Sequence, residues 1–183
     1  MASILLQDAC VLLNLLASGR FADIAGGCDL HFAMVPEVAG ETLYLRDAAS
    51  GKHEPVDLQV FIARGLLEVF AVKSQAEQIR FIELAVDLDD GEAASIAVAE
   101  ARDFALATDD KKARAVIQRK AVKIKLWSTF ELLRHWQVKA GISDGELGGA
   151  LLNIANRAKF CPKPGHPDFK WWSQAVGAKQ DKT

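Results

Sequence analysis

Short apolar runs alternate with longer segments of helical periodicity along most of this chain. The apolar runs predict β-strands at 3–7, 29–35, 65–72, 104–108 and 122–125. Segments whose apolar residues recur at helical spacing predict helices at 9–19, 19–27, 36–47, 74–88, 89–103, 109–121, 128–141 and 142–160. Strands that alternate with helices are typical of a parallel sheet covered on both faces. The pattern therefore predicts an α/β fold of three layers, α/β/α, around a central parallel sheet.

Local signals mark the ends of several predicted elements. Ser74 is followed three residues later by Glu77, which predicts a capping box at the start of a helix. Asp89 and Asp90 precede the next helical segment and are predicted to be its caps. The stretch 48–60 is polar and broken by glycine and proline, so it predicts an excursion from the core that contains a hairpin.

Length and composition narrow the classes of protein. A chain of 183 residues, half of them apolar, predicts one domain with one substantial core. A net charge of −2 excludes attachment to nucleic acid through bulk positive charge, so any such contact must be local. Cys10, Cys28 and Cys161 lack metal-ligand spacing and are predicted to be buried free thiols. The absence of a basic leader and of a long apolar run predicts a soluble, cytoplasmic protein with no membrane association.

Acidic residues gather near the carboxyl ends of the predicted strands. Because the carboxyl ends of parallel strands lie at one edge of a sheet, we expect these side chains to converge on one pocket. Clustered carboxylates raise each other's pKa and destabilise a fold near neutral pH unless a cation balances them. Oxygen ligands without nearby Cys or His favour Mg²⁺ or Mn²⁺, which suits metal-assisted hydrolysis of a phosphodiester. The acids are Asp8, Glu41, Glu92, Asp109 and Asp110.

Each of these acids also has a structural interpretation. Asp8 lies between a strand and a helix and is a candidate N-cap, as is either aspartate after the 104–108 strand. Glu92 lies in a first helical turn, where the helix dipole favours a carboxylate of any function. Glu41, on the flank of the predicted 36–47 helix, is equally typical of a solvated surface charge. The residue pattern leaves both interpretations open for each acid.

Four short motifs contain these acids: LLQDACVLLNLL, VPEVAGE, LDDGEAASIAVA and LATDDKKAR. Together they resemble the PIN-domain ribonucleases, specifically the VapC-type toxins and their uncharacterised bacterial relatives, and the likeness extends over residues 3–140. The resemblance implies a PIN-like nuclease domain over 1–141, with 43–60 as the excursion. We expect 142–183 to form a C-terminal helix and a Pro/aromatic tail packed on the same domain.

The resemblance also implies roles for individual residues. Thr108 would orient the last acid or a metal-bound water, and Asn14 would support Asp8. Either aspartate of the Thr-Asp-Asp run can face the pocket, so Asp109 stays an alternative to Asp110 as a ligand. The metal-binding acids implied by position are Asp8, Glu41, Glu92 and Asp110.

Two segments carry side chains suited to RNA. The basic segment 111–125 follows the last acid and can bind phosphates, although a solvated helix face explains the same charges. Its cations are Lys111, Lys112, Arg114, Arg119, Lys120, Lys123 and Lys125. The tail 160–172 interleaves lysines with Phe169, Trp171 and Trp172, which either stack on unpaired bases or form an aromatic clasp on the domain or a dimer. Three prolines predict that the whole stretch 161–183 is irregular.

The leading hypothesis is a Mg²⁺- or Mn²⁺-dependent endoribonuclease. By resemblance it is the toxin of a type II toxin–antitoxin pair and a homodimer, silenced when an antitoxin segment fills the acidic groove. The alternatives are a PIN-fold binding or assembly module without activity and a DNA-directed nuclease of similar architecture. A flavodoxin-like fold is disfavoured because no glycine-rich or hydroxyl-rich phosphate loop follows the first strand.

Overall fold

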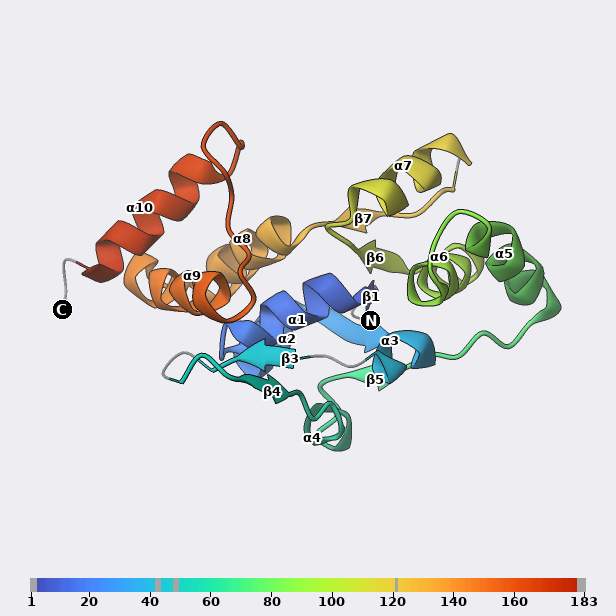
Figure 1. Cartoon of the computed structure of the whole chain (residues 1–183), viewed down its shortest axis with the longest axis horizontal. Helices are drawn as coiled ribbons and strands as arrows, with labels where there is room; N and C mark the ends of the chain where they lie inside the picture. Colours follow the sequence, from blue (N-terminus) through green and yellow to red (C-terminus); the bar gives the residue numbers. More distant parts are fainter. Residues whose placement is uncertain (1–2, 42–43, 48–49, 121, 181–183) are drawn as a thin grey trace. The chain divides into compact units, whose positions relative to one another are not determined.

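The computed structural model describes residues 3–41, 44–47, 50–120 and 122–180 (Figure 1). The chain divides into two compact units, each built from three stretches of sequence. The first unit comprises the described residues of 1–12, 29–42 and 57–129, and the second comprises those of 13–28, 43–56 and 130–183. The domain limits expected from the sequence stay a prediction.

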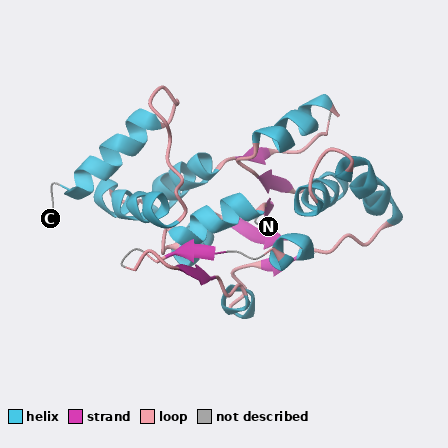
Figure 2. Cartoon of the chain, in the orientation of Figure 1, coloured by secondary structure: helices cyan, strands magenta, loops and turns pink. Residues whose placement is uncertain are grey.

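The first unit is built on a five-stranded sheet of order β5-β2-β1-β6-β7, drawn as magenta arrows in Figure 2. Every strand pair in it is parallel. The predictions of an α/β class and of a central parallel sheet flanked by helices are therefore confirmed. The strands are β1 (Ser3–Gln7), β2 (Leu30–Met34), β5 (Glu68–Val69), β6 (Ala105–Ala107) and β7 (Leu126–Trp127).

Helix α6 packs against this sheet and has two acidic residues, Asp90 and Glu92, in its first turn. It contacts β1 and β6 on one side and α3 and α5 on others. Its residues from 93 to 99 are buried alanine, serine, isoleucine and valine, and these small side chains let the neighbouring elements approach closely. The helices of this unit are α3 (Pro36–Gly40), α4 (Gln59–Ala63), α5 (Gln75–Ala85), α6 (Asp90–Arg102) and α7 (Lys111–Arg119), and α1 (Ala9–Ala17) begins in it.

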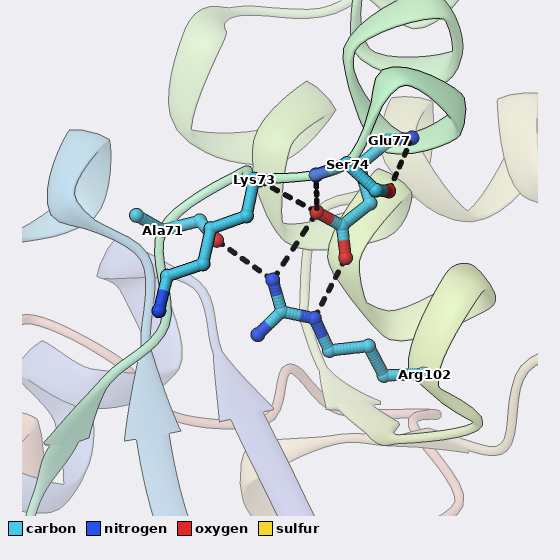
Figure 3. Close-up of polar contacts among 5 residues, drawn as sticks. All are labelled: Ala71, Lys73, Ser74, Glu77 and Arg102. Carbon is cyan, nitrogen blue, oxygen red and sulfur yellow. Dashed lines mark hydrogen bonds and ion pairs between the residues drawn. The ribbon is translucent and has the colours of Figure 1, made fainter.

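A partly buried ion pair joins the start of α5 to the end of α6 (Figure 3). Arg102 donates from Nε to Glu77 at 2.7 Å and from Nη2 to the Ala71 carbonyl at 2.8 Å. The Glu77 carboxylate also accepts the backbone N–H groups of Lys73 and Ser74, at 2.6 and 2.9 Å. The Arg102 bonds, followed by those backbone bonds, lower the pKa of Glu77 to about 2 although burial opposes them. The predicted capping box of Ser74 and Glu77 is confirmed.

The second unit packs helices against a two-stranded antiparallel sheet. That sheet pairs Tyr44–Arg46 with His53–Pro55, so the hairpin predicted in the excursion is present among the described residues. Helix α9 lies against α10 because Gly148 has no side chain, and a Cβ there would overlap the Ala175 carbonyl oxygen. The elements are α2 (Phe21–Gly27), β3 (Tyr44–Arg46), β4 (His53–Pro55), α8 (Thr129–Ala140, from its second residue), α9 (Asp144–Arg157) and α10 (Phe169–Gln180).

The tail folds onto its own unit, and the prediction that it is irregular is wrong for α10. The three prolines all precede this helix and so do not interrupt it. Trp172 meets the Phe130 ring edge-on at a centroid distance of 5.8 Å, and Phe160 stacks on the same ring at 4.9 Å. The Arg134 guanidinium lies 4.4 Å from the Trp171 ring centroid. These contacts correspond to the aromatic-clasp interpretation of the tail.

Several predicted bounds are wrong. The helix expected over 36–47 ends at Gly40, and Glu41 follows it with extended backbone at φ −67° and ψ 137°. The last strand lies at 126–127 instead of 122–125, because the N–H of Thr108 bonds the Trp127 carbonyl at 3.0 Å and so extends the parallel ladder there. The strand expected over 65–72 is regular only at 68–69.

Two expectations from composition are also tested. Cys28 is buried, whereas Cys10 and Cys161 are exposed, so the prediction of buried thiols is wrong for these two. Cys10 lies in the exposed first turn of α1, and Cys161 lies in the irregular segment between α9 and α10. Within the described ranges, no single helix has the length and apolar character needed to cross a membrane, and α1 with α2 meets that criterion only as a pair bent by 109°.

Candidate functional site

The parallel sheet brings distant acids together where its strand order reverses. From β1 the chain proceeds outward through β2 to β5, and β6 and β7 lie on the other side, so the reversal falls between β1 and β6. Asp8 directly follows β1, and its N–H bonds the Ala107 carbonyl of β6 at 3.0 Å. Thr108 directly follows β6. In parallel sheets this position, outside the carboxyl ends of the strands, is where ligand sites form.

Asp8 is the most buried acid of the site, with 5% of its surface exposed. Its Oδ1 accepts the Val11 N–H at 2.9 Å, so the predicted capping role at α1 is real. The pKa of Asp8 is raised to about 6, mainly by burial and also by the charges of Asp109 and Asp110. Hydrogen bonds from Thr108 and Val11 oppose that rise without cancelling it. Asp8 therefore acts as a cap and also carries a proton more readily than an ordinary aspartate.

Glu41 and Glu92 line the same cavity as Asp8. The cavity has a volume of about 60 Å³, enough for a water molecule or a small cation. Burial raises the pKa of Glu92 to about 7, with further contributions from Asp89, Asp110 and Asp8. Burial also raises the pKa of Glu41, again with Asp89 and Asp8 adding to it. Glu41 is exposed, as its interpretation as a solvated surface charge expects, and it also lines the acidic cavity.

Thr108 and the two following aspartates occupy different positions around the site. Both carboxylate oxygens of Asp109 accept from Thr129, Oδ1 from its N–H at 3.0 Å and Oδ2 from its hydroxyl at 2.5 Å. Asp110 caps α7 through the Ala113 N–H at 2.8 Å, and its own N–H donates to the Thr108 hydroxyl at 3.1 Å. Asp110 also raises the pKa of Glu92. These contacts favour Asp110 over Asp109 as the acid that faces Glu92.

Asn14 is the remaining residue singled out from the sequence. It is buried, with 4% of its surface exposed, and it lies on the part of α1 that belongs to the second unit. Its support of Asp8 stays a prediction.

Three residues at the site were missed from the sequence. Asp89 caps α6 as expected, but it also lines the acidic cavity. Cys10 lines that cavity too, and partial burial together with the nearby carboxylates raises its pKa to about 12. Ser95 lines a second, narrower cavity with Asp8, Glu92 and Thr108. The available signal was spacing, because Cys10 follows Asp8 by two residues and Ser95 follows Glu92 by three, on one helix face.

Most cations of the basic segment have partners inside the protein. Arg114 donates to the carbonyls of Thr108 and Trp127 at 2.9 and 2.7 Å, so it fastens α7 to the sheet. Arg119 and Lys120 pair with Asp87, and Lys125 lies 4.6 Å from the Trp127 ring centroid. The cations without a polar partner among the described residues are the exposed Lys111, Lys112 and Lys123.

The oxygen atoms that line the acidic cavity are the type of ligand that a hard divalent cation prefers. Carboxylate oxygens dominate the acidic cavity, and such ligands select Mg²⁺ or Mn²⁺. The buried Ser95 hydroxyl, which has no hydrogen-bond partner among the described residues, adds another oxygen beside Asp8 and Glu92. As the side chains stand, no three His, Cys, Asp or Glu residues of the described ranges are arranged to ligate one ion.

Comparison with known proteins adds no family to this description. No model of a protein family matches the chain, and neither the curated proteins nor the solved structures contain a significant match.

Proposed function

We propose that this protein is a metal-dependent endoribonuclease with a PIN-like fold, acting as the toxin of a type II toxin–antitoxin pair. One observation carries the proposal: acids from separate segments meet at the strand-order reversal of a parallel sheet, two with raised pKa values near neutrality. Such perturbed carboxylates in a cavity are typical of functional sites. The resemblance of the four motifs to VapC-type toxins supplies the reaction and the expected partners.

The residues that would hold Mg²⁺ or Mn²⁺ are Asp8, Glu41, Glu92 and Asp110. When bound, such a cation polarises a phosphodiester and lowers the pKa of a water molecule. The Thr108 hydroxyl holds two of these acids in register, because it bonds the Asp8 carboxylate and accepts the Asp110 N–H. In the metal-free protein the Glu92 carboxyl has a pKa of about 7, so cation binding at neutral pH would release its proton.

RNA is the proposed substrate, and its phosphates need local cations because the chain carries a net charge of −2. Lys111 and Lys112 follow Asp110 directly in the first turn of α7. The helix dipole disfavours cations at that end, so these lysines gain nothing from the helix itself. Both are exposed and without a polar partner among the described residues, which leaves them available to phosphates that enter the acidic cavity.

The experiment is a Mn²⁺ titration by calorimetry of the wild type, Asp8→Asn and Asp110→Asn, followed by cleavage assays. Asp90→Asn is the matched control, since it removes an exposed carboxylate from the first turn of α6. We expect saturable binding that both site variants lose and the control keeps, with circular dichroism verifying the fold. Cleavage of single-stranded RNA but not DNA of the same sequence would support the ribonuclease over the DNA-directed nuclease. Unchanged metal-dependent cleavage in both site variants would overturn the proposal.

The second candidate function is a partner-binding module without catalytic activity. An exposed apolar stripe on α5 and its C-cap residue favours it, formed by Ile79, Ile82 and Val86 at 52%, 65% and 82% exposure. Residues at this spacing share one helix face, and exposed apolar patches commonly mark protein interfaces. This candidate predicts no saturable Mn²⁺ binding and no growth defect on expression, together with a partner or a dimer that Ile82→Glu releases in light-scattering measurements.

A further inference from the structure

A cavity of about 580 Å³ lies within the second unit. Its walls are the turn after α1, one face of α9 and Lys179 near the end of α10. This volume is within the range typical of small-molecule sites and is much larger than that of the acidic cavity. The two cavities share no lining residue, so the proposed function leaves the larger one without a role.

Gly149 lines this cavity although no contact within the described protein requires glycine there. It lies in the interior of α9, where glycine destabilises a helix relative to alanine. Its neighbour Gly148 is needed for packing, because a Cβ there would overlap the Ala175 carbonyl oxygen. A Cβ on Gly149 would instead meet no atom of the described residues within 4 Å. The missing side chain therefore enlarges the cavity, and this is what a ligand that lies against the helix backbone requires.

The charged groups of the cavity favour an anion. They are the two cations Arg20 and Lys179 and the carboxylate of Glu146, so the local charge is positive although the chain carries −2. Arg20 pairs through Nε with Asp23 at 2.7 Å, and 43% of its side chain stays exposed. The rest of its guanidinium can therefore bind a phosphate, for which the planar fork of arginine is well suited. Glu146 is held as a cap of α9, because its carboxylate accepts the Ser143 hydroxyl at 2.7 Å.

Two asparagines on the α9 face add neutral hydrogen-bonding groups. Asn153 donates from Nδ2 to the Ser18 carbonyl at 3.1 Å, which orients its amide and leaves Oδ1 as an acceptor. Asn156 is exposed, and its side chain has no hydrogen-bond partner among the described residues. An amide both donates and accepts, so this pair suits the hydroxyl groups of a ligand.

We propose that this cavity binds a small phosphate ester that carries hydroxyl groups, of the size of a sugar phosphate or a nucleoside monophosphate. Arg20 binds the phosphate, and Asn153 and Asn156 bind the hydroxyls. The carbon skeleton lies against the backbone of Gly149. Because the acidic cavity takes no part, this inference is independent of the proposed nuclease and is tested separately from it.

The test is calorimetry with ribose 5-phosphate, adenosine 5′-monophosphate and ribose on the wild type, Arg20→Gln and Gly149→Leu. Ribose 5-phosphate should bind saturably, and ribose about tenfold more weakly, because hydrogen bonds to a charged group contribute at least that factor. Arg20→Gln should weaken the binding of ribose 5-phosphate by about tenfold for the same reason. Gly149→Leu should abolish it by filling the cavity. Tighter binding of the nucleotide would identify the ligand as a nucleotide, and tighter binding of ribose 5-phosphate as a free sugar phosphate; both support the site.

Gly149→Ala and Gly177→Ala form a matched pair for the same assay. Gly177 also lies within a helix, α10, with no described atom within 4 Å of a Cβ, but it does not line the cavity. Each alanine should raise the unfolding temperature by about 3 °C, and only Gly149→Ala should weaken the binding of ribose 5-phosphate. If Gly149→Leu fails to fold, this pair decides. The proposal is overturned if the wild type binds neither phosphate ester, or if Arg20→Gln and both Gly149 variants bind them as tightly as the wild type.

Discussion

Asp8 should make the metal-free protein less stable as the pH rises toward neutrality. Burial raises the pKa of Asp8 from 3.8 to about 6 in the folded protein, so the folded state keeps a proton that the unfolded state has lost. The resulting stability is fully present below about pH 3.8 and is lost as the pH rises through about 6. The difference corresponds to about 3 kcal/mol of unfolding free energy at neutral pH, about half of it lost between pH 5 and pH 7.

Asp8→Asn removes this charge with little other change. Asparagine is as good an N-cap as aspartate, so the bond from the Val11 N–H is retained. We expect Asp8→Asn to be more stable than the wild type at pH 7 by as much as about 3 kcal/mol, and by about half as much at pH 5. Urea unfolding followed by circular dichroism across this range, with a chelator present, measures both differences. Addition of Mn²⁺ should stabilise the wild type and not the variant.

Asp90→Asn provides the control, because it removes an exposed carboxylate from the first turn of α6. It should leave the pH dependence of the wild type intact. A wild type whose stability is flat or rising from pH 5 to pH 7, with the same profile in Asp8→Asn, would refute the reasoning. Cys10 gives an independent measurement, because burial and, to a lesser extent, the acids including Asp8 raise its pKa to about 12. Its alkylation by iodoacetamide at pH 8 should be slow in the wild type and faster in Asp8→Asn.

Three further substitutions test other features. Because the pKa of Glu77 is lowered to about 2, the wild type should lose stability as the pH falls from about 4.5 to 2. Glu77→Gln should lower the free energy of unfolding by about 3 kcal/mol at pH 7 in urea unfolding. The variant should not show the loss of stability between about pH 4.5 and pH 2. Gly91→Ala places a Cβ 2.5 Å from Glu41 Oε1, so we expect the Glu41 carboxylate to be displaced and Mn²⁺ binding to be weaker in calorimetry. The free energy of unfolding should be nearly unchanged, because alanine favours the helix by about 1 kcal/mol. Gly148→Ala should lower the unfolding free energy by about 2 kcal/mol, as its Cβ overlaps the Ala175 carbonyl oxygen, and should leave Mn²⁺ affinity unchanged. A stable Gly148→Ala protein would contradict this account of the α9 and α10 contact.

Much of the first unit follows from sequence periodicity because its determinants are local. Buried strands end at Asp8 and at Thr108, and parallel pairing of β1 with β6 necessarily brings those ends to the same edge of the sheet. The capping box at Ser74 also depends on residues three positions apart, so the sequence predicts it directly. The convergence of the acids was therefore predictable before their geometry was known.

Other features depend on contacts between residues far apart in the chain. Local sequence cannot distinguish Asp109 from Asp110, and the distinction arises because Thr129, twenty residues away, bonds both oxygens of Asp109. Helix α10 forms after a proline-rich stretch, where aromatic contacts with α8 help to hold it, as at Phe130 and Trp172. Strand and helix periodicity and the positions of the acids were thus determined by the sequence itself. The tertiary structure alone decided which acid faces Glu92 and where the Ser95 hydroxyl lies, because burial and hydrogen-bond partners are properties of the folded chain.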